Sequence, residues 1–193
     1  GRNSAEAIYF LSDYDNLLGE CTASSGSDCT IGDAFNGDAA TVQGIEFLFT
    51  TDLSRTGNYN IPVTFTYTYI DSEFDSDIAD TAFFGDVSEG DPIPYIPEHQ
   101  FNLSVGFLKD QWSSHINVNF VDEVCVRASC NAFERTDNTL TVDLSTHYAL
   151  SEKVDLYGKV ENITGEEDIL GRHPYGARPN KDRTATLGVR IDF

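Results

Sequence analysis

The feature that most constrains this chain is a repeated alternation of apolar and polar residues along most of its 193 positions. Successive side chains of a β-strand point to opposite faces, so a period of two predicts strands with one apolar and one polar face. Between Val63 and Tyr69, every odd position is apolar or aromatic and every even position is Thr. Such segments predict eight strands, at 5–12, 42–50, 63–69, 101–107, 112–120, 140–148, 154–161 and 185–193.

The two faces of these strands differ in charge. No charged residue falls on the apolar face of the last six segments. The opposite face must contact water or ionic partners, because a buried unpaired charge is very costly. Its charged residues are Asp143, Asp155, Lys159, Glu161, Arg190 and Asp192.

The connections between the segments alternate in length. This places all long loops at one end of the sheet and all short turns at the other, which is typical of an outer-membrane barrel with long extracellular loops. A periplasmic C-terminus agrees with this orientation. The long connections are 13–41, 72–98, 122–138 and 162–183, and the short ones are 51–60, 108–111 and 150–153.

A soluble β-sandwich would show the same alternation, with its apolar face turned inward. Two features favour a transmembrane antiparallel β-barrel instead. The runs reach about 9–11 residues, which crosses a bilayer when tilted, whereas ordinary strands have about 5–6. Aromatic residues also gather near strand ends, as interface girdles require. They are Tyr67, Tyr69, Phe101, Phe107, Trp112, Phe120, Tyr148 and Phe193.

Composition excludes some classes of function. With 12 basic and 32 acidic residues, the net charge of −20 disfavours a nucleic-acid partner. A hydrophobic content of 40% disfavours disorder. No apolar run approaches 18 residues, so no transmembrane helix is expected.

The four cysteines fall in two close pairs, Cys21 with Cys29 and Cys125 with Cys130. Neither pair has a zinc-site spacing with a nearby His. Two local disulfides, each in a long loop, are the preferred interpretation and imply an oxidising compartment. Free thiols in both loops are the alternative.

Several motifs resemble TonB-dependent outer-membrane receptors. The C-terminal end carries the most specific ones, with a turn after the penultimate strand, a Gly-x-Arg-Pro loop and a final Phe. Two further strand-entry motifs lie upstream, so the resemblance spans nearly the whole chain. The motifs are Glu161-Asn-Ile-Thr164, Gly176-Ala-Arg-Pro179, Arg183-Thr184, Phe193, Thr41-Val-Gln-Gly-Ile-Glu46 and Tyr95-Ile-Pro-Glu-His99.

The resemblance implies a 22-stranded barrel with an N-terminal plug domain and a TonB box. Residues 1–193 have neither, so we expect them to be the C-terminal part of such a barrel. The implied function is active uptake of a scarce ligand, a ferric siderophore or ferric citrate, across the outer membrane of a Gram-negative bacterium. The implied partners are lipid and lipopolysaccharide, the rest of the receptor, the TonB–ExbB–ExbD complex and the ferric chelate. No enzyme activity and no cofactor are implied.

A basic cluster stands out in the last long loop of this acidic chain. Ferric chelates are commonly anionic, and Arg binds carboxylates through two parallel hydrogen bonds. We therefore expect ligand contacts there, with internal salt bridges and packing against the plug as the alternative. The cluster is Arg172, His173, Arg178, Lys181 and Arg183. The resemblance makes Phe193 the signal for barrel assembly, a role compatible with a girdle position.

Other chemistry-bearing residues give no catalytic motif and no metal site. His115 and His147 lie on the polar face of neighbouring strands, where hydrogen bonding is the simpler role and a metal contact the alternative. The acidic run 71–80 lacks the Gly and Glu of an EF-hand loop, so a solvated loop is preferred over a calcium site.

Two further hypotheses remain open at this point. One is a stand-alone eight-stranded barrel with a structural or adhesive role, since eight strands can close. Small polar-face residues such as Ser104 and Gly106 argue against it, because a narrow barrel must fill its interior. The other is a soluble, calcium-dependent β-sandwich module.

Overall fold

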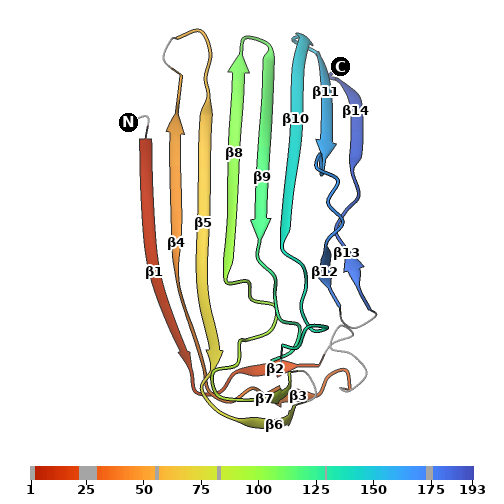
Figure 1. Ribbon diagram of the computed structural model, residues 1–193. Helices are drawn as coiled ribbons and strands as arrows, with labels where there is room; N and C mark the ends of the chain where they lie inside the picture. The colour runs from red at the N-terminus through yellow and green to blue at the C-terminus, as the bar shows by residue number, and fades with distance from the viewer. Residues whose placement is uncertain (1–2, 22–29, 55–56, 82–83, 129, 173–175) are drawn as a thin grey trace.

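The computed structural model describes residues 3–21, 30–54, 57–81, 84–128, 130–172 and 176–193. Eight long strands form one antiparallel sheet in the order β1-β4-β5-β8-β9-β10-β11-β14 (Figure 1). Their bounds are β1 Asn3–Tyr14, β4 Ala40–Asp52, β5 Pro62–Phe74, β8 His99–Lys109, β9 Trp112–Val121, β10 Thr139–Ser151, β11 Val154–Glu161 and β14 Thr184–Ile191. The prediction of eight strands is confirmed.

Strand bounds differ from the prediction at the ends. Most strands extend two to five residues beyond the alternating core, because backbone pairing continues where side chains no longer need to match an apolar environment. The largest extension is at β5, which continues to Phe74 and so takes Asp71 and Glu73 out of the predicted acidic loop. The last strand instead ends at Ile191, two residues before Phe193.

The register keeps the two faces separate across the whole sheet. Phe47, Tyr67, Phe101, Phe120 and Leu140 are successive Cα partners, so one apolar row crosses five strands. A one-residue slip would turn every apolar side chain of a strand to the polar face. The alternation in sequence therefore excludes registers that differ from this one by an odd number of residues.

The apolar face has no second sheet over it in the part of the chain that the structure describes. On β14, the side chain of Leu187 is 88% exposed, and Val189 and Ile191 are also exposed. A soluble sandwich would bury this face. The sandwich alternatives are therefore wrong.

Aromatic side chains form two bands on the apolar face. One band contains Phe101 and Phe120, whose ring centroids are 5.2 Å apart. The other contains Trp112 and Tyr148, at 6.1 Å. Phe107 joins the second band and lies six residues beyond Phe101, roughly 20 Å along β8. This spacing approaches the height of about 25 Å of the apolar belt of outer-membrane barrels.

Long and short connections lie at opposite ends of the sheet, which we call the long-loop end and the short-turn end (Figure 1). Short strands pair at the long-loop end, β2 with β3, β6 with β7 and β12 with β13. These short strands carry no alternation long enough to be predicted from the sequence. They are β2 Leu18–Glu20, β3 Ala34–Asn36, β6 Ile78–Thr81, β7 Gly85–Val87, β12 Ile169–Gly171 and β13 Arg178–Pro179.

The buried core of the described residues lies among the long loops and at the strand ends next to them. Ala40 and Phe74 are fully buried where β4 and β5 reach this end, and Phe74 packs edge-on against Phe84 at 5.0 Å. Hydrogen bonds then join one loop to the next, from Ala128 N to Phe84 O and from Asp137 N to Ile169 O. The described loops therefore form a connected, packed layer.

The sheet is open at its edges. Within the described residues, β1 pairs with β4 alone and β14 pairs with β11 alone. A stand-alone barrel of eight strands would require β1 and β14 to pair with each other. The observed topology is a segment of a larger wall and does not support that alternative. No helix among the described residues is long and apolar enough to cross a membrane.

Candidate functional site

The polar face carries the candidate site, because its side chains are small or hydrogen-bonding and leave surface for contacts. Thr66, Asn102, Asn119 and Thr141 are successive Cα partners across four strands. Within this row, Asn102 Nδ2 donates to Asn119 Oδ1. The polar side chains therefore partly satisfy one another and form a hydrophilic wall.

Two carboxylates on this wall have no cationic partner among the described residues. Glu6 lies on β1 and Glu46 on β4, and they are diagonal neighbours on one face because Glu46 pairs with Ile8, two residues from Glu6. They line a hollow of about 280 Å³ together with Thr66 and Thr68. Two nearby carboxylates without a counter-ion provide a contact for a cationic group.

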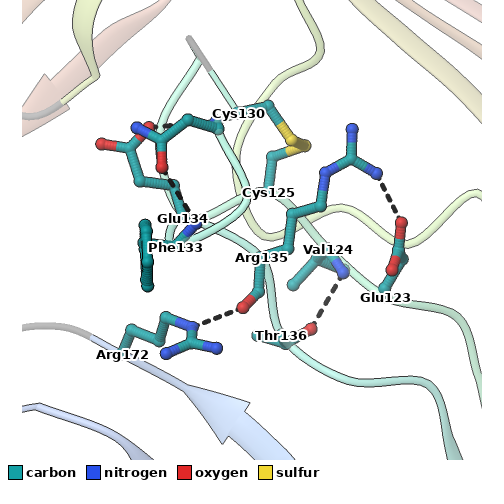
Figure 2. The surroundings of a disulfide bond; sticks show 10 residues. Glu123, Val124, Cys125, Cys130, Phe133, Glu134, Arg135, Thr136 and Arg172 are labelled. Carbon is teal, nitrogen blue, oxygen red and sulfur yellow. Dashed lines mark hydrogen bonds and ion pairs between the residues drawn. A yellow bond between two sulfur atoms is a disulfide. The ribbon is translucent and has the colours of Figure 1, made fainter.

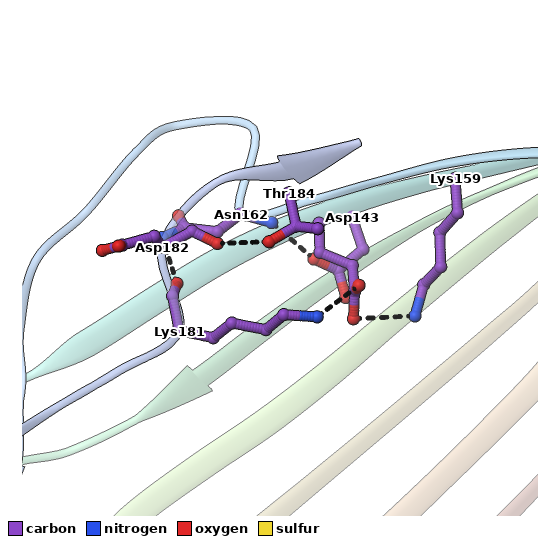
Figure 3. Close-up of polar contacts among 7 residues, drawn as sticks. Asp143, Lys159, Asn162, Lys181, Asp182 and Thr184 are labelled. Atoms are coloured by element: carbon purple, nitrogen blue, oxygen red, sulfur yellow. Dashed lines mark hydrogen bonds and ion pairs between the residues drawn. The ribbon is translucent and has the colours of Figure 1, made fainter. Parts of the chain in front are cut away.

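A charged cluster lies on the same face where β11 reaches the long-loop end (Figure 3). The two oxygens of the Glu161 carboxylate each accept from a different lysine, Oε1 from Lys159 Nζ at 2.9 Å and Oε2 from Lys181 Nζ at 2.6 Å. Lys159 and Glu161 share a face because they are two residues apart on one strand. Lys181 reaches the same carboxylate from the segment that leads into β14.

Asn162 holds the turn that follows β11. Its side chain is almost fully buried, and its φ of +50° is one that Asn tolerates better than most residues. Nδ2 donates to the carbonyls of Glu166 and Lys181, at 2.8 and 2.9 Å. Oδ1 accepts from the backbone N–H groups of Gly165 and Glu166. One amide thus joins both ends of the last long loop and positions Lys181.

The five residues of the predicted basic cluster lie at two places. Arg172 Nε donates to the carbonyl of Arg135 in the neighbouring loop, and the Arg178 guanidinium lies against Gly171 in the β12–β13 ladder. Lys181 and Arg183 instead contact the Glu161–Asn162 corner, where Arg183 Nε donates to Asn162 O at 3.4 Å. His173 lies outside the described residues.

These four residues contact other parts of the same chain, and of these contacts the one between Lys181 and Glu161 is an ion pair. Sequence reasoning did not place Lys159 with Lys181, although Lys159 was assigned to the polar face. The contact between Lys159 and Glu161 could have been predicted, because residues two positions apart on a strand lie on the same face. The path of the last loop, which brings Lys181 to them, has no such signal in the sequence.

The loop between β9 and β10 contains a disulfide between Cys125 and Cys130, whose Cα atoms are 5.1 Å apart (Figure 2). Glu123 forms an ion pair with Arg135 beside it. The loop presents Phe133, which is 84% exposed, and Phe133 N donates to Asn131 Oδ1.

The other predicted cysteine pair is only partly described. Cys29 lies outside the described residues, so the pairing of Cys21 with Cys29 stays a prediction.

The predicted histidine pair lies on adjacent strands without forming a metal cluster. His115 pairs with Ser145 and His147 with Ser113, so the two histidines are diagonal neighbours. The His147 ring stacks on Tyr157 at 6.0 Å between centroids. Among the described residues, no group of three or more His, Cys, Asp or Glu side chains could hold a metal ion, including those of the acidic run.

Comparison with protein families gives one match over most of the chain. Residues 1–163 match the model of the TonB-dependent receptor-like β-barrel. No curated protein matches the sequence.

Solved structures show the same fold at low sequence identity. The ferric citrate transporter FecA, in its unliganded form, superposes with a TM-score of 0.74 at 19% identity, covering 100% of this chain and 29% of that one. The siderophore receptor PiuA from Acinetobacter baumannii gives 0.72 at 18% identity, with 98% and 26% covered. The copper transporter OprC gives 0.70 at 16% identity, with 100% and 29% covered. The chain thus spans less than a third of each of these proteins.

Proposed function

The chain belongs to the family of TonB-dependent receptor-like β-barrels, and we propose that it forms part of the barrel of a receptor for active uptake of a ferric siderophore or ferric citrate. Receptors of this family lie in the outer membrane of Gram-negative bacteria. The eight-stranded antiparallel sheet of this chain is the kind of structure that forms the wall of such barrels.

The observation that carries the proposal is the separation of the two faces of one open sheet. The apolar face, with its two aromatic bands, has the chemistry of a lipid contact. The polar face has the chemistry of a hydrated lumen. With 11 residues, β8 as a whole has the length that a tilted strand needs to cross the hydrocarbon core.

The proposal includes an orientation. The long loops lie outside the cell and the short turns in the periplasm, as is usual for outer-membrane barrels. This places the disulfide of the β9–β10 loop in an oxidising environment. It also places the outer ends of the strands against lipopolysaccharide.

We also propose that residues 1–193 are the C-terminal part of the receptor, with the plug domain, the remaining strands and the TonB-contacting segment supplied by the rest of the protein. The unpaired carboxylates of Glu6 and Glu46 support this, because a lumenal wall that packs against a plug needs charged contacts of complementary sign. TonB, ExbB and ExbD would supply the energy through that other part.

Ferric chelates are the proposed ligand class because solved neighbours include receptors for a siderophore and for ferric citrate. Residues of the predicted basic cluster would contact an anionic chelate. The cluster is Arg172, His173, Arg178, Lys181 and Arg183. A copper transporter is also among the similar structures, so the experiment must test which metal is taken up.

The test uses the full-length receptor, expressed in a Gram-negative host that lacks its own ferric-chelate receptors. Uptake of radiolabelled iron is measured for a panel of citrate, catecholate and hydroxamate chelates, with radiolabelled copper alongside, in hosts with and without TonB. We expect TonB-dependent uptake of at least one ferric chelate and none of copper. A receptor that reaches the outer membrane yet imports no ferric chelate would overturn the proposal.

A further inference from the structure

The carboxylate of Glu161 is held between two lysines. One ammonium group donates to each carboxylate oxygen, from Lys159 on the same strand and from Lys181 on the following segment (Figure 3). The two lysines come from separate segments of the chain, and Asn162 fixes the backbone of the second one through Lys181 O. Their spacing is therefore set by the fold, and it suits a single carboxylate.

The cluster is accessible from the polar face. The side chains of Lys159 and Lys181 are 46% and 60% exposed, while that of Glu161 is 23% exposed. Water therefore reaches both ammonium groups, while the carboxylate between them is partly buried. The nearby Asp143 interacts with Lys159 through its charge, while its Oδ1 accepts a hydrogen bond from Asn162 N at 2.9 Å.

A second carboxylate can therefore reach both lysines from the solvent side and replace that of Glu161. The incoming group takes over both ammonium contacts, and the Glu161 side chain turns into water. Two lysines then face one ligand carboxylate, which favours an anionic ligand in a chain whose net charge of −20 otherwise repels anions.

We propose that Lys159 and Lys181 form a binding site for a carboxylate-rich ferric chelate, and that Glu161 occupies this site until the ligand displaces it. This inference rests on the proposed function and narrows its ligand class. A neutral chelate gains nothing from the two ammonium groups, so the site distinguishes chelates by charge.

The experiment measures binding by calorimetry to the full-length receptor in detergent. The probes are ferric dicitrate, which carries carboxylates, and a neutral ferric trihydroxamate. We expect Lys159→Gln and Lys181→Gln each to weaken ferric dicitrate binding about tenfold, as expected for a lost charge-assisted hydrogen bond. Glu161→Gln, which removes the competing carboxylate, should strengthen it about threefold. None of the three should change trihydroxamate binding.

Two controls separate binding from folding. Lys153→Gln removes an equal charge at the short turn between β10 and β11 and should leave ferric dicitrate binding unchanged. Lys159→Arg keeps the charge and should retain most of the affinity if the Gln variant loses it through charge. Each variant is compared with the native receptor for heat-modifiable mobility, which reports a closed barrel.

Three results would overturn the inference. These are unchanged ferric dicitrate binding in both lysine variants, a loss in Glu161→Gln as large as theirs, or no binding of ferric dicitrate to the native receptor. In the last case, TonB-dependent uptake of another ferric chelate would leave the proposed function intact. Absence of uptake for every ferric chelate would remove both.

Discussion

At the scale of single residues, Asn162 does more than any other described side chain to shape the candidate site. Its amide satisfies backbone groups at both ends of the last long loop, at Gly165, Glu166 and Lys181. A buried amide with several partners is costly to remove, because those partners then lose their hydrogen bonds without gaining water.

We therefore expect Asn162→Ala to destabilise this corner by about 2 kcal/mol and to loosen segment 163–183. Hydrogen exchange of the full-length receptor would measure the loss as faster exchange at these amides. Asn58→Ala, at an exposed position in the turn between β4 and β5, is the matched control and should change nothing. Equal protection of these amides from exchange in both variants would contradict the role of Asn162 in holding the loop.

Gly188 is the second residue whose identity the structure explains. It lies on the polar face of β14 opposite Tyr157, and a Cβ at this position would meet the tyrosine ring at 2.2 Å. The ring therefore covers the glycine and stacks on His147 on its other side.

Gly188→Val should push the Tyr157 ring away and destabilise the receptor by about 2 kcal/mol, the cost of overpacking. The loss should shrink in a Tyr157→Ala background, where the space is free. Urea unfolding of the four proteins of this double-mutant cycle measures the coupling. Additive effects of the two substitutions would show that the ring does not occupy that space.

At the scale of elements, the strands were predictable and the loops were not. A period of two determines which residues share a face, so the eight strands and their two faces could be predicted from the sequence. The exact register comes from the structure, because a slip of two residues would leave every face unchanged. The short strands at the long-loop end have two to four residues each, which is too few to show an alternation. Their pairing depends on contacts such as Phe74 with Phe84, which join segments that are separate in the sequence.

The same distinction explains the candidate site. Lys159 and Glu161 share a face by parity, which the sequence shows. Lys181 joins them because of the loop path that Asn162 holds, and no local pattern encodes that path. Basic residues that are close in the sequence, such as Arg172 and Lys181, therefore contact different parts of the molecule.

The assignment of faces makes a sharp prediction for β14. Leu187 and Thr186 are adjacent, yet they lie on opposite faces. Leu187→Arg places a charge on the lipid face and should cost about 2–4 kcal/mol if it lies near the bilayer midplane, whereas Thr186→Arg places the charge in the lumen and should be tolerated. The amount of heat-modifiable receptor in outer membranes is the measurement. Equal yields, or a larger loss for Thr186→Arg, would show that the faces are reversed.

At the scale of the whole molecule, the open edges of the sheet decide what this segment can do by itself. β1 and β14 each have one unpaired side in the described chain. Backbone N–H and C=O groups without partners cost several kcal/mol each in hydrocarbon, so a sheet spans a membrane only when its edges are paired. The wall therefore needs further strands.

We expect residues 1–193, expressed alone and refolded in detergent, to give no monomeric, heat-modifiable barrel. Aggregates, or assemblies in which copies pair edge to edge, should form instead, because either satisfies the open strands. The full-length receptor refolded under the same conditions is the control and should give a monomer that migrates differently before and after heating. A stable heat-modifiable monomer of 21.3 kDa would show that β1 and β14 can close on each other. The segment would then be a barrel in its own right, with an interior too narrow for the plug that the proposed transport function requires.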